Sequence, residues 1–259
     1  MIYISWYHQN LPRIFGLFSF IINPIFIYLV ITKSRSAMGN YKYLLMIFAV
    51  FDILYSISEI LTPIGVTGNK HGFVVFLTEG PFFDHPEIGQ HVMSNRCGFI
   101  SLSYALLIIH FIYRYMSLFH PERLSLFFRP LGIITAIVFL LAHAASWSLI
   151  CQQCLAGNDE VREILANELF EDFGADSRKL PMLAALYYDA SDYIRFRSWL
   201  GIFLLTATSF YSMSVYFVMG FKIMRKISVM QASHKLSKNS IRLQKQLFQT
   251  LIIQVRCQS

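Results

Sequence analysis

Five predominantly apolar stretches limit what this chain can fold into more than any other feature. The first, residues 14–31, has eighteen residues without a charge. A helix rises 1.5 Å per residue, so this stretch is about 27 Å long, close to the ~30 Å of membrane hydrocarbon. The other four stretches are 44–66, 97–116, 131–150 and 199–221. The pattern predicts an all-α membrane protein, a helical bundle with five full spans.

Composition agrees with a chain embedded in the lipid bilayer. Hydrophobic residues make up 55% of the sequence and charged residues 14%, whereas soluble domains carry about a quarter charged residues. The net charge of +7 raises the question of nucleic acid. The basic residues are dispersed among apolar spans rather than gathered on a polar domain, so we expect no nucleic-acid partner.

The charges between the spans predict an orientation. Segments 32–43, 117–130 and 222–246 are rich in Lys and Arg, and the last has seven basic residues and no acid. Basic loops favour the cytoplasm, so we expect these three inside and the N-terminus outside. The long loop 151–198 carries nine acids and is expected outside, although Arg195 and Arg197 near its end oppose this assignment.

Polar side chains within the spans are candidates for a ligand pocket. Asp52 and Glu59 are seven residues apart, and therefore two turns along one helical face. Charges at membrane depth usually face a bundle interior or water. Ser101 and Tyr104 on the third span and Ser209 on the fifth add hydroxyl groups. We expect these five residues to line a shared pocket. The alternative is that the hydroxyls only satisfy nearby backbone groups and hold helices together.

Three cysteines are expected on the outer, oxidising side. Cys97 lies at the outer end of the third span, and Cys151 and Cys154 follow the fourth. A disulfide from Cys97 to either of the pair would tie the long loop to the bundle. The CxxC spacing also resembles half a zinc site, but the sequence has no second CxxC, so we expect no metal. No cofactor or catalytic motif is apparent, and we do not expect an enzyme.

The long loop also contains a helical pattern. Apolar residues recur at helical spacing from Val161 to Phe170, after a capping residue at Asn158 or Asp159 and before Gly174. We expect a short amphipathic helix over the outer mouth of the bundle. The alternative is a solvated loop helix without a role in ligand binding.

Several short motifs appear in a fixed order near the span ends. They are Asn23-Pro24, residues 39–43, residues 110–115 with Leu118, Phe119 and Pro121, residues 197–201, and residues 243–248. Together they resemble the nematode seven-transmembrane chemoreceptors of the Str and Srj type. The resemblance implies a G-protein-coupled receptor in the plasma membrane of ciliated sensory neurons. It would bind a small molecule outside and a heterotrimeric G protein inside.

The resemblance also implies a G-protein face at the cytoplasmic ends of the spans. Arg114 matches the arginine that such receptors use toward the G protein. Tyr115 lies beside it, and Lys222, Arg225 and Lys226 follow the fifth span. The alternative for Arg114 is a snorkelling interfacial anchor.

The C-terminal part departs from the family pattern. Residues 247–254 begin a sixth span but reach only about 12 Å, and 255–259 form a tail unlike the family. We therefore expect residues 1–254 to be a truncated receptor bundle that does not signal by itself. A truncated product, an alternative exon and a gene-model error remain open. The competing functions are a small-solute transporter or channel, and a non-signalling membrane partner that forms oligomers with intact receptors.

Overall fold

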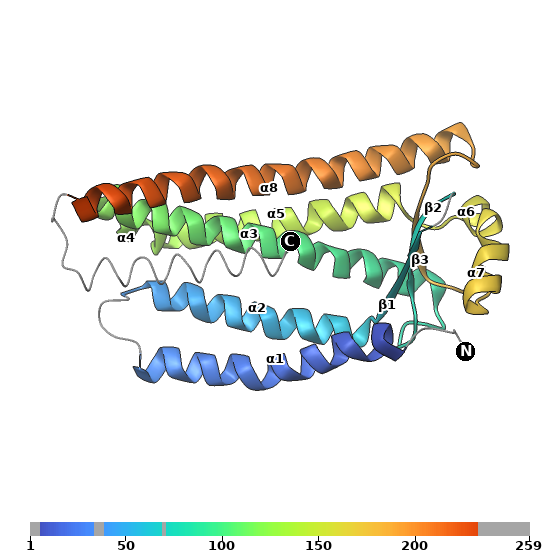
Figure 1. Cartoon of the computed structure of the whole chain (residues 1–259), viewed down its shortest axis with the longest axis horizontal. Coiled ribbons are helices and arrows are strands. Elements are labelled where there is room, and N and C mark those ends of the chain that lie inside the picture. Colours follow the sequence, from blue (N-terminus) through green and yellow to red (C-terminus); the bar gives the residue numbers. More distant parts are fainter. Residues whose placement is uncertain (1–5, 34–38, 69–70, 233–259) are drawn as a thin grey trace. The chain divides into compact units, whose positions relative to one another are not determined.

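The structure is a computed structural model that describes residues 6–33, 39–68 and 71–232 (Figure 1). Within these residues five helices are long and apolar enough to cross a membrane. They are α1 (Trp6–Lys33), α2 (Tyr41–Leu61), α3 (Pro86–Phe119), α5 (Pro130–Cys154) and α8 (Asp192–Ala232). The expected helical membrane fold with five spans is therefore confirmed. The expected start of a sixth span at 247–254 and the tail at 255–259 lie outside the described residues.

The helices extend beyond several of the expected span boundaries, and two of the differences have a local cause in the sequence. The stretch 44–66 does not stay helical to its end, because α2 stops at Leu61 and Ile64–Gly68 forms strand β1. Pro63 explains the change, since proline lacks an N–H donor and disfavours helical backbone in the residue before it. The third helix begins at Pro86, eleven residues before Cys97. Proline at the first helical position and Glu87 in the first turn both favour that start.

Three strands outside the spans form an antiparallel sheet that the sequence did not lead us to expect. Strand β1 pairs with β2 (Gly72–Leu77), and β2 pairs with β3 (Met182–Leu186). The first two strands connect α2 to α3, whereas β3 belongs to the segment between α5 and α8. Because these two connections share one sheet, they lie on the same side of the membrane.

Two short helices pack on this sheet and complete what we call the cap, residues 62–68, 71–85 and 155–191. They are α6 (Asp159–Ile164) and α7 (Ala166–Phe173). Buried side chains from the sheet, both helices and the start of α8 form one apolar core. The ring of Phe76 on β2 meets that of Phe173 on α7, with ring centres 5.0 Å apart. The cap is thus a small folded layer and not a pair of separate loops.

The amphipathic helix expected in the long loop is present, divided in two. The Asn158 side chain accepts a hydrogen bond from the Val161 amide at 3.0 Å and so caps α6. Gly174 ends α7 in a left-handed conformation, with φ of 64°. The helix breaks at Leu165, which is fully buried in the cap core. Phe170, which we expected on the apolar face, is 67% exposed.

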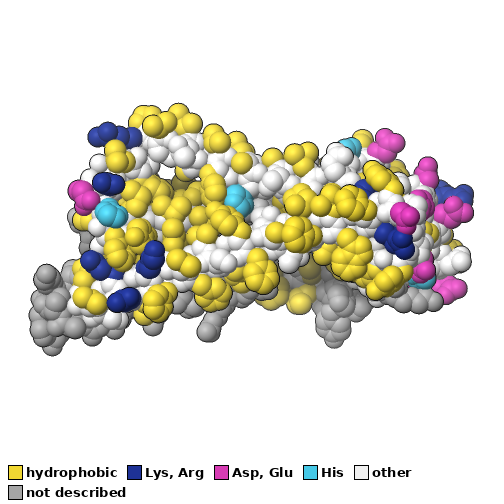
Figure 2. Space-filling model, turned by 90° about the horizontal axis from the view of Figure 1, so that it is seen from above, with side chains coloured by type: hydrophobic (Ala, Val, Ile, Leu, Met, Phe, Trp, Pro, Cys, Tyr) yellow, Lys and Arg dark blue, Asp and Glu magenta, His cyan; other side chains and the backbone are white. Residues whose placement is uncertain are grey.

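The chain falls into two compact units, which are described separately below. The first contains residues 1–99 and 145–205, and the second contains 100–144 and 206–259. Helices α3, α5 and α8 run through both. The second unit also holds a short 3₁₀ helix, Pro121–Arg123, and α4 (Leu124–Phe127). Figure 2 shows apolar side chains along the helices and acidic side chains gathered where the cap lies.

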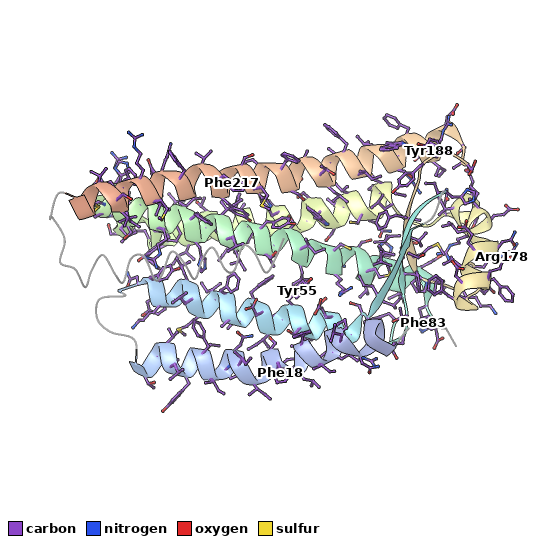
Figure 3. All side chains as sticks on the ribbon, in the orientation of Figure 1. Phe18, Tyr55, Phe83, Arg178, Tyr188 and Phe217 are labelled. Atoms are coloured by element: carbon purple, nitrogen blue, oxygen red, sulfur yellow. The ribbon has the colours of Figure 1, made fainter. Side chains whose placement is uncertain are left out.

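Apolar side chains of the long helices are widely exposed. In α1, for example, Phe15 is 64% and Leu17 60% exposed, and Phe18 also extends outward from the helix (Figure 3). On α8, Phe217 is 75% exposed. Such continuous apolar surface is unstable in water but suits contact with lipid tails. The exposed faces therefore agree with helices that lie in a bilayer.

Candidate functional site

A cleft of about 870 Å³ opens within the cap of the first unit. It lies between the start of α3, the start of α6 and the segment that follows α7. Most of its lining is polar or charged: His85, Pro86, Glu87, Ile88, Gln90, Gly157, Asp159, Arg162, Glu163 and Arg178. Arg178 lies beside α7 in Figure 3. A cleft with this lining can bind a small ligand that carries polar or charged groups.

Two hydrogen-bonded side chains shape this cleft. Gln90 on α3 accepts a hydrogen bond from the Gly157 amide at 3.1 Å, so it joins α3 to the segment before α6. Arg162 on α6 donates to the carbonyl oxygens of Ser177 and Leu180, at 2.6 and 2.8 Å. Burial lowers the pKa of Arg162, and the nearby Asp159 carboxylate opposes that shift. The guanidinium remains a cation at neutral pH and holds the segment after α7 in place.

The first unit also contains the two acids that we expected in a pocket. Glu59 of α2 accepts a hydrogen bond from Arg96 of α3 at 3.3 Å. Asp52 is half-buried, and its backbone oxygen accepts hydrogen bonds from Ser56 at 2.8 Å and from Ser19 of α1 at 3.3 Å. Glu59 therefore joins α2 to α3, and Asp52 lies where α1 meets α2.

The three cysteines of the predicted disulfide are free thiols in the structure. The thiols of Cys97 on α3 and Cys151 on α5 are joined by a hydrogen bond. Cys154 lies one turn further along α5 and packs against Gly201 of α8. The structure thus brings Cys97 to Cys151, and the disulfide itself stays a prediction.

The remaining expected pocket residues belong to the second unit. Ser101 is fully buried, and its hydroxyl lies 3.2 Å from the ring of His143 on α5. Tyr104 is half-buried, and its backbone oxygen accepts a hydrogen bond from the Tyr216 hydroxyl of α8 at 2.9 Å. Ser209 is half-buried on α8. Ser101 and Tyr104 thus contact neighbouring helices of the second unit, whereas Asp52 and Glu59 belong to the first unit.

Many hydroxyl groups in the spans bond to their own helix backbone, as the structural alternative proposed. Ser94, Ser103 and Ser212 each donate to a carbonyl three or four residues earlier, at 2.7 to 3.0 Å. Ser94 also donates to Gln152 of α5 at 2.9 Å. Backbone satisfaction therefore accounts for part of the polar pattern, and contacts between helices account for the rest.

In the second unit, Lys and Arg side chains gather near α4 and the end of α8 (Figure 2). The ring of Tyr115 stacks on that of Phe119, with centres 4.4 Å apart. The ammonium of Lys222 lies 6.0 Å from the centre of the Tyr115 ring, and that of Lys226 lies 5.1 Å from Phe119. These are cation–π distances. We call Tyr115, Phe119, Lys222 and Lys226 the basic–aromatic cluster.

Arg225 and Arg114, the other two residues expected at the G-protein face, differ in exposure. Arg225 is exposed on α8. Arg114 is only 4% exposed, buried within the second unit. Its neighbour Tyr113 packs edge-to-face on Phe127, the last residue of α4, and on Phe128, which follows it. Arg114 is therefore a buried side chain in this structure and not a snorkelling anchor.

Two contact residues were missed from the sequence. Arg96 lies just before the stretch that we took as the third span, although the unpaired acid Glu59 was a signal that a basic partner was needed. His143 lies on the mostly apolar helix α5, and no spacing pattern pointed to it. Its ring also packs 4.7 Å from that of Phe139.

Residues 2–257 match the family described as serpentine type 7TM GPCR chemoreceptor Srj. The chain is 31% identical to serpentine receptor class J-38 of Caenorhabditis elegans, over 96% of this chain and 75% of that protein. It is 27% identical to the G-protein coupled receptor str-217 of the same organism, over 96% of this chain and 72% of that one. These are receptors and not enzymes. The chain belongs to the Srj family of serpentine seven-transmembrane chemoreceptors.

Proposed function

We propose that this chain is a chemosensory receptor of the plasma membrane that binds a small molecule outside and signals to a G protein inside. In this orientation the N-terminus and the cap are extracellular, and the three basic segments face the cytoplasm. The sheet of β1, β2 and β3 supports one part of this orientation, because the connections before α3 and before α8 share it and so lie on the same side of the membrane. The excess of Lys and Arg in the opposite connections supports the rest. Ciliated sensory neurons are the site that the family resemblance implies.

The cap cleft is the observation that carries the ligand side of the proposal. Its volume of about 870 Å³ falls in the range of small-molecule sites. Arg178 and Glu163 both line the cleft, carry opposite charges and are exposed to an arriving ligand. The polar residues inside the spans, Glu59 with Arg96 and Ser101 with His143, form a second set of contacts that a ligand can perturb.

The basic–aromatic cluster supports the G-protein side. Its two lysines extend over stacked aromatic rings at the end of α3, where basic side chains can meet an acidic partner. The exposed Arg225 adds a guanidinium, which suits carboxylate recognition. Arg114 is buried, so in this proposal it reaches a partner only after α3 and α8 rearrange.

A cell assay tests the proposal. Because the truncated bundle is expected not to signal by itself, the chain is extended to seven spans and expressed with a promiscuous G protein. Its surface level is measured, and calcium is recorded against a broad odorant panel. We expect Arg178→Glu to shift the response to any active odorant at least tenfold in concentration. Lys179→Glu is the matched control, because Lys179 is the next residue along but does not line the cleft. Equal effects of both variants, at normal surface levels, would contradict a ligand role for the cleft.

A further inference from the structure

His71 lies between two carboxylates that come from different parts of the cap. Its Nε2 atom lies 3.2 Å from an oxygen of Glu168 on α7. Its Nδ1 atom forms a short contact with Asp189, in the segment that joins β3 to α8. The His71 side chain is 22% exposed and that of Glu168 29%, whereas Asp189 is 60% exposed. Both ring nitrogens thus face a carboxylate in a partly shielded position.

This contact joins three segments that are distant in the sequence. His71 immediately precedes β2, and its backbone oxygen accepts a hydrogen bond from the Tyr187 amide at 2.8 Å, just beyond β3. The adjacent strand pair is Gly72 with Leu186. His71 therefore closes the end of the β2–β3 ladder through its backbone, and its ring adds α7 and the segment before α8.

Only a doubly protonated His71 ring can donate hydrogen bonds to both carboxylates. A neutral imidazole carries one N–H, and its other nitrogen is an acceptor. Carboxylates accept hydrogen bonds and do not donate them, so a neutral ring can satisfy only one of Glu168 and Asp189. The doubly protonated ring donates to both, and its charge strengthens each bond. The described residues contain no group of three side chains placed to hold a metal ion.

We propose that His71, Glu168 and Asp189 form a proton-binding site that clasps the cap closed when its surroundings are acidic. Histidine changes charge between about pH 5 and 8, so the clasp is tight at the acid end of this range and loosens toward the alkaline end. The inference rests on cap geometry and does not depend on the proposed ligand or G protein.

The surrounding charges favour the same direction. Helix α7 also carries Glu171 and Asp172, both exposed, and these acids add negative potential near a cationic ring. The segment after β3 carries the phenols Tyr187 and Tyr188. At the start of α8, Asp192 pairs with Arg195. Glu160 of α6 accepts hydrogen bonds from the amide and the hydroxyl of Ser191, so the charges of Asp192 and Glu160 are already engaged.

Amide hydrogen exchange on the whole purified chain in lipid nanodiscs measures the clasp directly. Exchange of peptides that cover residues 182–189 is compared at pH 5.5 and pH 8.0, after correction for the intrinsic effect of pH on exchange. We expect protection in the unaltered chain to be roughly three- to tenfold greater at pH 5.5, the size of a charge-assisted contact that is partly exposed.

Three variants separate the clasp from other causes. His71→Gln and the double variant Glu168→Gln with Asp189→Asn are each expected to remove the pH difference. His91→Gln is the matched control, because His91 is an exposed histidine of α3 in the same unit, and it should leave the difference unchanged. Equal protection at both pH values in the unaltered chain would overturn the proposal. A pH difference that persists in either test variant would overturn it too, and the double variant decides if His71→Gln fails to fold.

Discussion

Arg96 and Glu59 form an ion pair between α3 and α2, with a nitrogen–oxygen distance of 3.3 Å. The side chains are 11% and 24% exposed, so both charges have lost most of their water. Each needs the other, because an unpaired charge at this depth carries a large desolvation cost. The pair also fixes how α2 and α3 meet in the first unit.

Removing either charge of this pair is expected to destabilise the chain. Arg96→Gln or Glu59→Gln leaves the opposite charge without its partner, at a cost of about 1–3 kcal/mol given that neither side chain is fully buried. The double variant should recover part of this loss, since no charge is then left unpaired. Thermal unfolding in detergent measures all three. Asp84→Asn, which removes an exposed acid just before α3, is the control. Additive losses in the double variant would show that the two charges are not coupled.

Oxidation is expected to join Cys97 to Cys151 and leave Cys154 as a thiol. The thiols of the first two are in hydrogen-bonded contact, whereas Cys154 packs against Gly201. A disulfide here would close a loop of more than 50 residues and stabilise the fold by about 4 kcal/mol in the chain-entropy treatment. Non-reducing peptide mapping detects the link.

Single serine substitutions provide the controls for this disulfide. Cys151→Ser should abolish the linked peptide and lower the unfolding temperature, and Cys154→Ser should do neither. Peptides in which Cys97 is linked to Cys154, or in which all three thiols react freely, would contradict the expected pairing.

The five spans were predictable because lipid imposes one strong requirement on sequence, a long apolar run that pairs its own backbone. The cap lacks such a signal. Strand β1 follows an apolar helix closely, so its apolar residues Ile64 and Val66 were included in the expected span 44–66. Strand β3, Met182–Leu186, is buried at every position and therefore shows no alternation of polar and apolar residues. Its strand identity depends on pairing with β2, which is distant in the sequence.

Contacts between helices were predictable only in part. Ser94, Cys97 and Ser101 are spaced three and four residues apart and therefore share one face of α3. Each of them contacts a residue of α5 in its own unit. The partner residues could not be found in the same way. Gln152 and His143 lie among apolar residues of α5 with no periodic polar pattern, and their pairing depends on how far one helix is shifted along the other. Sequence periodicity fixes a face but not that shift.

Loss of the Lys222 charge is expected to weaken G-protein coupling. Its ammonium lies over the Tyr115 ring, 6.0 Å from the centre, and a cation–π contact of this kind contributes about 0.5–1 kcal/mol at an exposed site. Lys222→Gln removes both the contact and a charge that can attract an acidic partner. In the chain extended to seven spans, we expect about a threefold lower rate of nucleotide exchange on the G protein, at equal surface expression.

The conservative variant separates charge from fold at this position. Lys222→Arg keeps the cation and its contact with the ring, so coupling should remain near that of the unaltered chain. If Lys222→Gln couples normally, the basic–aromatic cluster serves membrane topology and not the G protein. Arg114→Ala tests the buried arginine in the same assay, and normal coupling with normal surface expression would remove Arg114 from the mechanism.

Replacement of Arg162 is expected to loosen the segment between α7 and β3. Its guanidinium donates to the carbonyl oxygens of Ser177 and Leu180, and the Ser177 hydroxyl donates to the Arg162 backbone oxygen at 2.7 Å. Arg162→Gln should forfeit about 1–3 kcal/mol, because charged hydrogen bonds to buried carbonyls are lost. Trypsin cleavage after Arg178 and Lys179 should become several-fold faster, and Arg195→Gln, which alters an exposed ion pair, should leave that rate unchanged.

The pH dependence of this effect separates Arg162 from His71. Burial lowers the pKa of Arg162, so the folded state disfavours its charged form and any linked loss of charge would appear only at strongly alkaline pH. A guanidinium keeps its proton throughout the range from pH 5.5 to 8.0. The cleavage rates of Arg162→Gln and of the unaltered chain should therefore differ by the same factor at both pH values. The effect of His71→Gln should appear at pH 5.5 and shrink at pH 8.0. A pH-dependent ratio for Arg162→Gln would mean that Arg162 acts through the His71 clasp and not through the carbonyl groups it holds.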